Sequence, residues 1–416
     1  MWENLSADEQ RLLAALDAQA EELYGLLAAL VRAPSVNPPG DTRAPVAVAR
    51  DWLAARGIVA EVLGSAPERP SMIARCAFGE AGQAGPRLLF LSHLDTVPLG
   101  DATGWTVDPF GAVVRDGRMW GRGAADAKGS AAPMLLALSA LAAAAPPLRG
   151  SLAVALVADE ETGGAGAQYL LDRGALTAHG VVVGETTNNE VAIAEKGVAW
   201  LRLVTRGRTA HASVPHAGVN AAAQLVRWLA RVEQNVATRL PERRHPLVSP
   251  PSLSLSTLAG GVASNVVPDR AEAVVDRPTL PGETLVGARA EILAEAAPLQ
   301  ADDPAIQPAV EVMVWAEPFE TAPDAAIVRA ALAARRTLGL SAAPVGYQQA
   351  SDGRFFGARG VPTLVLGPGV AEGTHVPDES VPLAQVVEAA KLYALTALRY
   401  LAAAGPGTSP PGARPD

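Results

Sequence analysis

The chain has 416 residues, of which 49% are apolar and 19% charged, so it has the composition of a globular protein with room for two domains. Its net charge is −9 and it has no basic run, which argues against nucleic acid or an anionic membrane as the main partner. A single cysteine excludes an internal disulfide, and the first ten residues lack the basic-then-apolar order of a signal peptide, so we expect a cytoplasmic protein.

Helical spacing of Leu and Ala alternates with continuous apolar runs along the first half of the chain. These patterns predict helices over residues 12–32, 44–56 and 131–144, and strands over residues 87–95, 151–161 and 179–185. The alanine-rich stretch 131–147 is shorter than a membrane span and is broken by prolines, so we expect a buried helix there. Apolar strands separated by helices indicate an α/β fold with a mostly parallel sheet flanked by helices.

The pattern changes near residue 194, where strands of alternating polarity replace the continuous apolar runs. Residues 194–318 show the order strand, helix, strand, strand, helix, strand, which predicts a small α+β sandwich. The earlier pattern then returns with a helix, a strand and a helix over residues 324–338, 362–369 and 383–403. We therefore expect a discontinuous α/β domain over residues 1–193 and 319–403, with an inserted domain over residues 194–318. Residues 404–416 are expected to be a disordered tail.

A histidine and an aspartate stand at the end of the first apolar strand, in FLSHLDTVP (90–98). Successive side chains of a strand point to opposite faces, so His93 and Asp95 are expected to share one face. A histidine that binds a metal commonly donates its other ring N–H to a carboxylate. This pair predicts His93 as a metal ligand and Asp95 as its partner; a histidine that only caps a turn is the alternative.

Three acids in a row, Asp159, Glu160 and Glu161, follow the next strand in LVADEETGG (156–164). Adjacent carboxylates at the end of a buried strand repel one another and lose hydration unless a cation compensates them. One of Glu160 and Glu161 can then bind a metal while the other faces the substrate as a general base. A solvated acidic turn is the alternative, but it fits a single acid better than this run.

Three further residues complete a set of candidate ligands. Asp126 lies in the glycine-rich loop GRGAADAKGS (121–130), where a helix-capping aspartate is the alternative, Glu185 ends HGVVVGE, and His375 lies in GTHVPDE. Two imidazoles and three carboxylates suit zinc or a similar divalent ion, the set being His93, Asp126, Glu161, Glu185 and His375. With one carboxylate shared, five ligands serve two ions about 3.5–4 Å apart, as in co-catalytic hydrolases.

Motifs along nearly the whole chain, from residue 35 to about 395, resemble one enzyme family. They are SHLDTVP, WTVDPFGAVVRDGRMWGRGAADAKG, DEETGG, GETT, HASVPHAGVNA, NVVPD, SDGRFF and THVPDE, in this order. The family is that of the co-catalytic zinc amidohydrolases, which includes acetylornithine deacetylase, succinyl-diaminopimelate desuccinylase, aminoacylase and the glutamate carboxypeptidases. The resemblance implies that Asp126 bridges two metal sites, one completed by His93 and Glu185 and the other by Glu161 and His375.

The resemblance also implies catalytic and substrate-binding roles. Glu160 is implied as the general base, and His211 as a residue that stabilises the oxyanion, often from a partner subunit across a dimer interface. Asn265 and Arg354 resemble substrate-contacting residues of the family. The alternatives are a turn histidine for His211 and a surface salt bridge for Arg354. Residues 194–318 would then form a lid and the interface of a homodimer.

One position departs from the family. Many members carry Asp-x-Arg before x-x-Pro-Gly, and that arginine is thought to hold the substrate carboxylate. Here the stretch reads DRPTLPG, with Pro278 at the arginine's place and Arg277 one position earlier. Because a shift of one residue in a strand turns the side chain to the opposite face, either Arg354 alone anchors a carboxylate or the preferred substrate differs.

The expected activity is metal-dependent hydrolysis of the amide bond of an N-acyl amino acid, with two zinc ions, or cobalt or manganese in their place. The expected partner is therefore a small molecule, with neither nucleic acid nor a membrane involved. A dipeptidase or carboxypeptidase on the same scaffold is the first alternative. A non-catalytic binding protein with a vestigial site is the second, and the presence of all five ligands with Glu160 argues against it.

Overall fold

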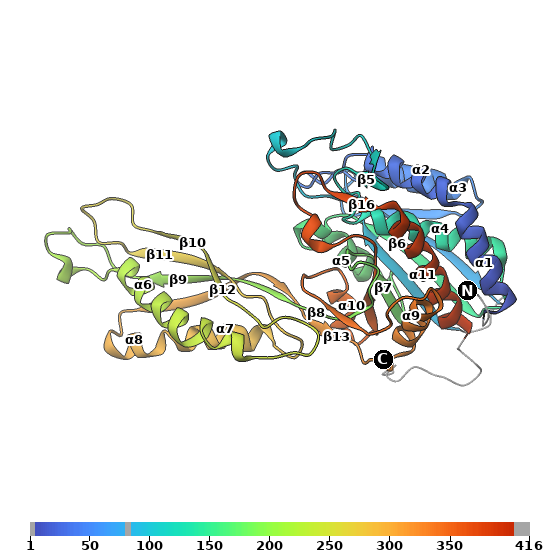
Figure 1. Cartoon of the computed structure of the whole chain (residues 1–416). Coiled ribbons are helices and arrows are strands. Elements are labelled where there is room, and N and C mark those ends of the chain that lie inside the picture. Colours follow the sequence, from blue (N-terminus) through green and yellow to red (C-terminus); the bar gives the residue numbers. More distant parts are fainter. Residues whose placement is uncertain (1–4, 80–84, 403–416) are drawn as a thin grey trace. The chain divides into compact units, whose positions relative to one another are not determined.

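Figure 1 shows the computed structural model, which describes residues 5–79 and 85–402. The chain forms two compact units. The first consists of the residues up to Ile193, Thr321–Gly346 and the residues from Ser351 onward, and the second of Ala194–Glu320 and Tyr347–Ala350. The tail expected over residues 404–416 lies outside the described residues.

The central sheet, most of which lies in the first unit, has the strand order β1-β2-β6-β3-β7-β15-β8-β13, where β13 is Phe319–Glu320. Its four middle strands run parallel, namely β6 (Gly150–Val157), β3 (Arg87–His93), β7 (Gly180–Val183) and β15 (Thr363–Val365). Antiparallel strands extend both edges, namely β1 (Ala60–Gly64) with β2 (Pro70–Phe78), and β8 (Ala192–Glu195). The predicted mostly parallel sheet is thus confirmed, although the sequence patterns predict neither β1 nor β2, whose apolar runs are interrupted by polar residues.

The register of the parallel strands brings their carboxyl ends to one edge of the sheet. Leu91 of β3 lies opposite both Ala155 of β6 and Val183 of β7. Side chains that follow these strands therefore emerge close together, which is where ligands sit in open α/β sheets.

Helices cover both faces of this sheet. α4 (Lys128–Ala144) packs on β3 and β6, and α11 (Leu383–Ala402) lies against α4 and α9 (Ala326–Thr337). The crossovers β3-α4-β6 and β6-α5-β7 step in opposite directions along the sheet. Because such crossovers are right-handed, α5 (Ala165–Asp172) lies on the other face from α4 (Figure 1).

The helix expected over residues 12–32 is instead two helices. α1 (Ala7–Ala18) ends just before Gln19, α2 (Ala20–Val31) begins just after it, and α3 (Arg43–Ala54) follows. Each of the first two helices buries its own leucine face, so the apolar periodicity continues across Gln19 although the helix does not. Periodicity alone therefore does not detect this break.

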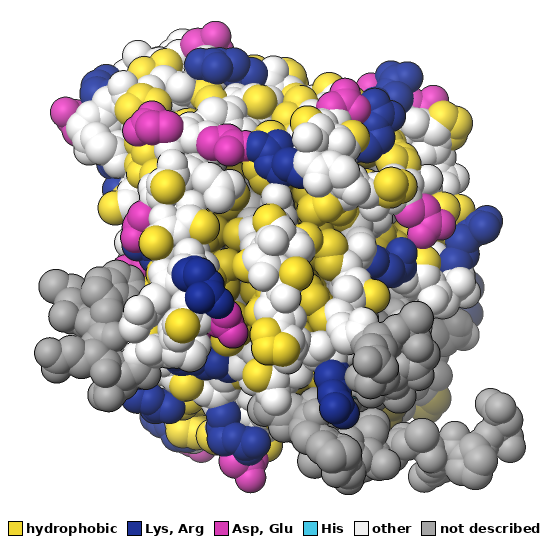
Figure 2. All heavy atoms as spheres, turned by 90° about the vertical axis from the view of Figure 1, so that its right-hand side faces the viewer, with side chains coloured by type: hydrophobic (Ala, Val, Ile, Leu, Met, Phe, Trp, Pro, Cys, Tyr) yellow, Lys and Arg dark blue, Asp and Glu magenta, His cyan; other side chains and the backbone are white. Residues whose placement is uncertain are grey.

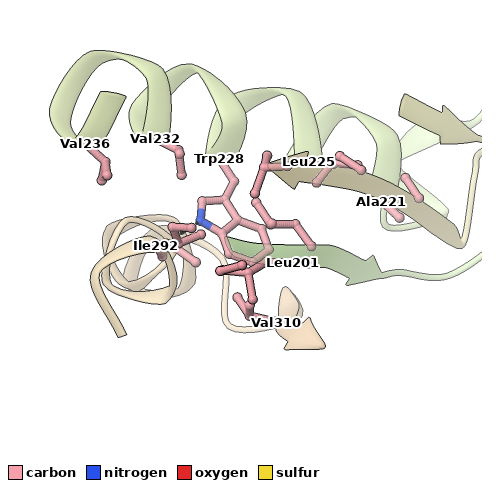
Figure 3. Close-up of a cluster of buried hydrophobic side chains, with 14 of the residues drawn as sticks. Leu201, Ala221, Leu225, Trp228, Val232, Val236, Ile292 and Val310 are labelled. Carbon is pink, nitrogen blue, oxygen red and sulfur yellow. Dashed lines mark hydrogen bonds between the residues drawn. The ribbon is translucent and has the colours of Figure 1, made fainter. Parts of the chain in front are cut away.

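The second unit is an antiparallel sheet covered by helices. Its strand order is β10-β11-β9-β12, with bounds Ser254–Gly260, Arg270–Asp276, Val198–Arg206 and Gln307–Ala316. α6 (Ala221–Val232) and α7 (Leu285–Ala294) pack on this sheet, followed by the short α8 (Ala297–Asp302). Between the two packed helices lies Trp228, which contacts the buried cluster of Figure 3 and donates a hydrogen bond from Nε1 to the carbonyl of Ile292 at 2.9 Å.

A small sheet in the first unit joins segments far apart in sequence. β5 (Arg118–Trp120) pairs with β4 (Val113–Arg115) and with β16 (Ser380–Pro382), so Trp120 lies opposite Ser380. Three further short elements are β13 (Phe319–Glu320), β14 (Val345–Tyr347) and α10 (Arg354–Gly357).

The surface drawn in Figure 2 carries Lys and Arg side chains interspersed with Asp and Glu side chains, with hydrophobic atoms between them. Neither sign of charge forms a continuous patch on this face. Within residues 5–79 and 85–402, no helix has the length and apolar character needed to cross a membrane.

Candidate metal centre

His93 is the last residue of β3, and its ring is held in a defined orientation. Its Nδ1 lies 2.9 Å from the carbonyl oxygen of Asp95, so Nδ1 carries the proton and donates it. The Asp95 carboxylate is farther from Nδ1, at 3.6 Å. Nε2 therefore faces the site, where it lies 3.1 Å from Oδ1 of Asp126.

The carboxylate of Asp95 holds the acidic turn that follows β6. It accepts hydrogen bonds from the backbone N–H of Glu160 at 3.1 Å and of Glu161 at 3.2 Å. It also accepts one from Nδ2 of Asn37 at 2.9 Å. Asp95 is fully buried, so these bonds fix the turn relative to the end of β3.

Asp126 lies just before α4, and its two carboxylate oxygens face different histidines. Oδ1 lies 3.1 Å from Nε2 of His93, whereas Oδ2 lies 3.2 Å from Nε2 of His375. A carboxylate placed between two imidazoles in this way can donate one oxygen to each of two cations.

Glu161 and Glu185 each lie near a different histidine. Glu161 Oε2 lies 3.2 Å from Nε2 of His375, and Glu185 Oε1 lies 3.6 Å from Nε2 of His93. The ligand atoms of His93, Asp126 and Glu161 all lie within 4.8 Å of one another. All five residues expected as metal ligands are therefore brought together.

One buried oxygen of this cluster has no protein partner. Oε1 of Glu161 is buried and accepts no hydrogen bond from any residue that the structure describes. Such an atom is costly unless a cation or water compensates it. Together with the mixed set of imidazoles and carboxylates, this oxygen shows that the site fits divalent metal ions.

The electrostatics of the cluster show an excess of negative charge. Burial and the neighbouring carboxylates raise the pKa of Glu185 well above its usual value, and they raise the pKa of Glu161 as well. Hydrogen bonds to Asp126 and Glu161 raise the pKa of His375 to about 10. The protein alone thus draws protons into this site, and bound cations would take their place.

Glu160 lies beside the ligands, next to Arg354 and near Asp352, which precedes α10. Its Oε1 is 3.8 Å from Nη1 of Arg354, whose Nη2 is 3.4 Å from Oδ1 of Asp352. Arg354 begins α10 and is only 7% exposed, so a surface salt bridge does not describe it. Burial and the Asp352 charge raise the pKa of Glu160 well above its usual value.

His211 and Asn265 belong to the second unit, where they lie close together. The backbone N–H of Ala212 donates to the carbonyl of Asn265 at 2.9 Å, and Nδ1 of His211 is 2.7 Å from the hydroxyl of Ser213. The His211 ring is exposed. A cavity of about 600 Å³ adjoins them, lined by residues that include Ala212, Ser264 and Val266.

Arg277 stands one position before the place of the family arginine, and its side chain lies inside the second unit. It is fully buried, and its Nη2 lies 2.8 Å from Glu283 and 3.3 Å from Glu291. Arg243 pairs with the same two glutamates. Arg277 therefore belongs to a buried network of ion pairs and presents no free guanidinium.

Several residues near the site are not predicted from the sequence as functional. Asn37 binds the Asp95 carboxylate, Asp352 faces Arg354, and Glu379 pairs with Arg122 beside Asp126. Glu379 does lie in the motif THVPDE, so the motif that supplied His375 contained a signal for it.

Comparison with known proteins gives a concordant result. Residues 89–399 match the family described as peptidase family M20/M25/M40. The chain is 31% identical over 382 residues to a succinyl-diaminopimelate desuccinylase of Gluconacetobacter diazotrophicus, covering 88% of this chain and 93% of that protein. It is also 31% identical over 392 residues to the desuccinylase of Paracoccus denitrificans, covering 91% and 98%.

Solved structures share the fold. Aminopeptidase PepT from Bacillus cereus superposes with a TM-score of 0.72 at 23% identity, covering 92% of this chain and 98% of that one. The YXEP protein of Bacillus subtilis, described as a dinuclear metal-binding peptidase, gives a TM-score of 0.72 at 17% identity, covering 92% and 99%.

Proposed function

The chain belongs to peptidase family M20/M25/M40 and is a metallo-hydrolase of amide bonds, and from this premise we propose that it removes the acyl group from a small N-acyl amino acid. The observation that carries the proposal is the placement of the Asp126 carboxylate between His93 and His375. The two desuccinylases favour deacylation over cleavage of dipeptides.

The five clustered residues would hold two divalent ions. We assign His93 and Glu185 to one ion, His375 and Glu161 to the other, and Asp126 to both, which agrees with their distances. Zinc suits this donor set, with cobalt or manganese as alternatives. Such a pair of ions supplies a Lewis acid for the amide carbonyl and lowers the pKa of water to about 7.

Glu160 is the proposed general base. It would accept the proton of the attacking water and return it to the leaving amine. Glu160 suits this role because it lies beside the proposed ligands without being one of them, with Arg354 Nη1 3.8 Å from its Oε1. Asp95 is proposed as a positioning residue, because its carboxylate holds the backbone of Glu160 and Glu161.

Three residues are proposed to contact the substrate. His211 would donate to the oxyanion, and Asn265 lies next to it in the second unit. Arg354 would face a substrate carboxylate, since a guanidinium offers paired donors to such a group. Arg277 is engaged by Glu283 and Glu291, which leaves Arg354 as the candidate arginine for this role.

We also propose a homodimer formed through the second unit and a location in the cytoplasm. β10 is the edge strand of its sheet, and all seven of its residues are exposed, including Leu255 and Leu258. An exposed apolar edge strand is suited to pairing with a second copy. A reducing compartment is consistent with the single cysteine.

A substrate panel tests the proposed activity. The protein is treated with chelator, reloaded with zinc or cobalt, and assayed against N-acetyl and N-succinyl amino acids beside dipeptides. We expect metal-dependent release of the acyl group, with full activity at two ions per chain. Faster cleavage of dipeptides would make it a dipeptidase, and absence of both bound metal and turnover would make it a binding protein.

A further inference from the structure

Glu379 links the two loops that carry Asp126 and His375. It lies four residues after His375, and its side chain turns back toward the loop that leads into α4. The pairing of β16 with β5 brings it there, because Ser380 lies opposite Trp120. The backbone N–H of Gly121 completes the link by donating to the carbonyl of Glu379 at 2.9 Å.

The carboxylate of Glu379 is fully engaged. Oε1 accepts hydrogen bonds from the backbone N–H of Ala125 at 2.9 Å and of Asp126 at 3.0 Å. Oε2 accepts one from Nη1 of Arg122 at 2.6 Å. The Asp126 bond is direct, so a shift of Glu379 moves the backbone from which the bridging carboxylate projects.

Arg122 is itself fixed from several sides. Its Nη2 donates to the carbonyl of Pro98 at 3.2 Å, and its guanidinium lies 5.3 Å from the centre of the Trp105 ring. The side chains of Arg122 and Glu379 are each only 1% exposed. A buried pair of this kind offers little net stability over apolar residues, so stability alone does not account for its presence beside the site.

We propose that the Arg122–Glu379 pair is a positioning device that fixes the bridging carboxylate of Asp126 relative to His375. The proposal rests on the two-ion site proposed above. Donor atoms must be held within about 0.5 Å for productive metal geometry, and one side chain bonded to both loops supplies that constraint. The pair touches no ligand atom, and it acts through the Asp126 backbone and the chain leading to His375.

Glu379→Gln tests the proposal, because it keeps the size of the side chain while turning an amide N–H₂ toward Arg122. Glu372→Gln is the matched control, since Glu372 is an exposed acid of the same loop. Stepwise zinc binding is measured by calorimetry, and visible absorption spectra are recorded with cobalt. These readouts report the ligand geometry without depending on turnover.

We expect Glu379→Gln to bind one ion at least about tenfold more weakly, with an altered cobalt spectrum and kcat about 10- to 100-fold lower, whereas KM changes little. The control should match the original protein. If Glu379→Gln is recovered unfolded, Glu379→Asp, which keeps the charge but is one methylene shorter, is compared by the same cobalt titration. It should show the same weakened site.

Two results would overturn the proposal. In the first, a folded Glu379 variant binds two ions with unchanged affinity and an unchanged cobalt spectrum, even with lower thermal stability, so that the pair is only structural. In the second, the control weakens binding equally. Failure of the proposed function is distinguishable, because the original protein would then bind fewer than two ions or hydrolyse no acyl amino acid.

Discussion

The carboxylate of Asp95 accepts a hydrogen bond from the backbone N–H of Glu160 at 3.1 Å, so the segment after β3 is fastened to the turn that carries the proposed base. The same carboxylate binds the next N–H, that of Glu161. One buried side chain therefore sets the positions of both a proposed metal ligand and the proposed base.

Asp95→Asn tests whether the Asp95 carboxylate positions the turn that carries Glu160 and Glu161. An amide oxygen can accept one of the two N–H bonds, but the N–H₂ group meets the other donor. We expect kcat to fall about 10- to 100-fold, as is typical when a residue that orients ligands is changed. Asp116→Asn is the control, because the Asp116 side chain is 84% exposed. Unchanged kinetics in Asp95→Asn would show that the turn keeps its position without this carboxylate.

Glu160→Gln tests the general base. The amide keeps the shape of the side chain but cannot take a proton, so turnover should fall about 10²- to 10⁴-fold. Two ions should still bind, because Glu160 is not among the proposed ligands. Metal content is measured by elemental analysis beside kcat. Turnover near the original level would assign the base to another group, and loss of an ion would make Glu160 a ligand.

The sequence predicts that the metal ligands converge, because most of them follow the ends of strands and the ends of parallel strands meet at one edge of a sheet. His93 ends one apolar strand, and Glu161 and Glu185 follow the ends of the two neighbouring strands by four and two residues, so all three lie at one edge of the parallel sheet, where the register brings the strand ends together. Asp126 and His375 lie in loops, so the residues alone make them only candidate ligands, and the resemblance to a family adds the bridging role of Asp126 and the metal site that His375 completes.

Other contacts could not be predicted because they depend on loop geometry. β3 ends at His93, so the alternation of strand side chains no longer applies to Asp95, and its backbone carbonyl lies closer to the imidazole than its carboxylate does. Glu379 and Asn37 act across loops that the sequence does not place side by side. No periodicity reports such contacts.

Removal of metal should make the stability of the protein depend on pH in a defined direction. In the folded, metal-free state, burial raises the pKa of Glu160 and Glu185 above the usual 4.5, and hydrogen bonds raise that of His375 to about 10. These groups hold protons in the folded chain at pH values where the unfolded chain has lost them. Stability therefore falls as the pH rises.

The carboxyl groups contribute this loss above about pH 4.5, and His375 contributes it between its usual pKa of 6.5 and about 10. We expect the chelated protein to have a lower Tm at about pH 8 than at about pH 5.5, and reloading with zinc to raise Tm more at the higher pH. The measurement is thermal unfolding across this range. If zinc raised Tm equally at both pH values, the metal-free site would not take up protons as inferred here.

Arg277→Met tests whether the displaced arginine is structural. It removes one of the two cations that pair with Glu283 and Glu291, leaving Arg243 alone with both. We expect the second unit to lose about 2–4 kcal/mol of stability, measured by urea unfolding, since a buried pair is broken on one side. KM for the best acyl amino acid should stay unchanged, because Arg277 is fully buried.

The exposed Arg244 supplies the control Arg244→Met, which should alter neither the stability of the second unit nor KM. A KM raised about tenfold with unchanged stability would instead place Arg277 in contact with the substrate, against the burial seen here.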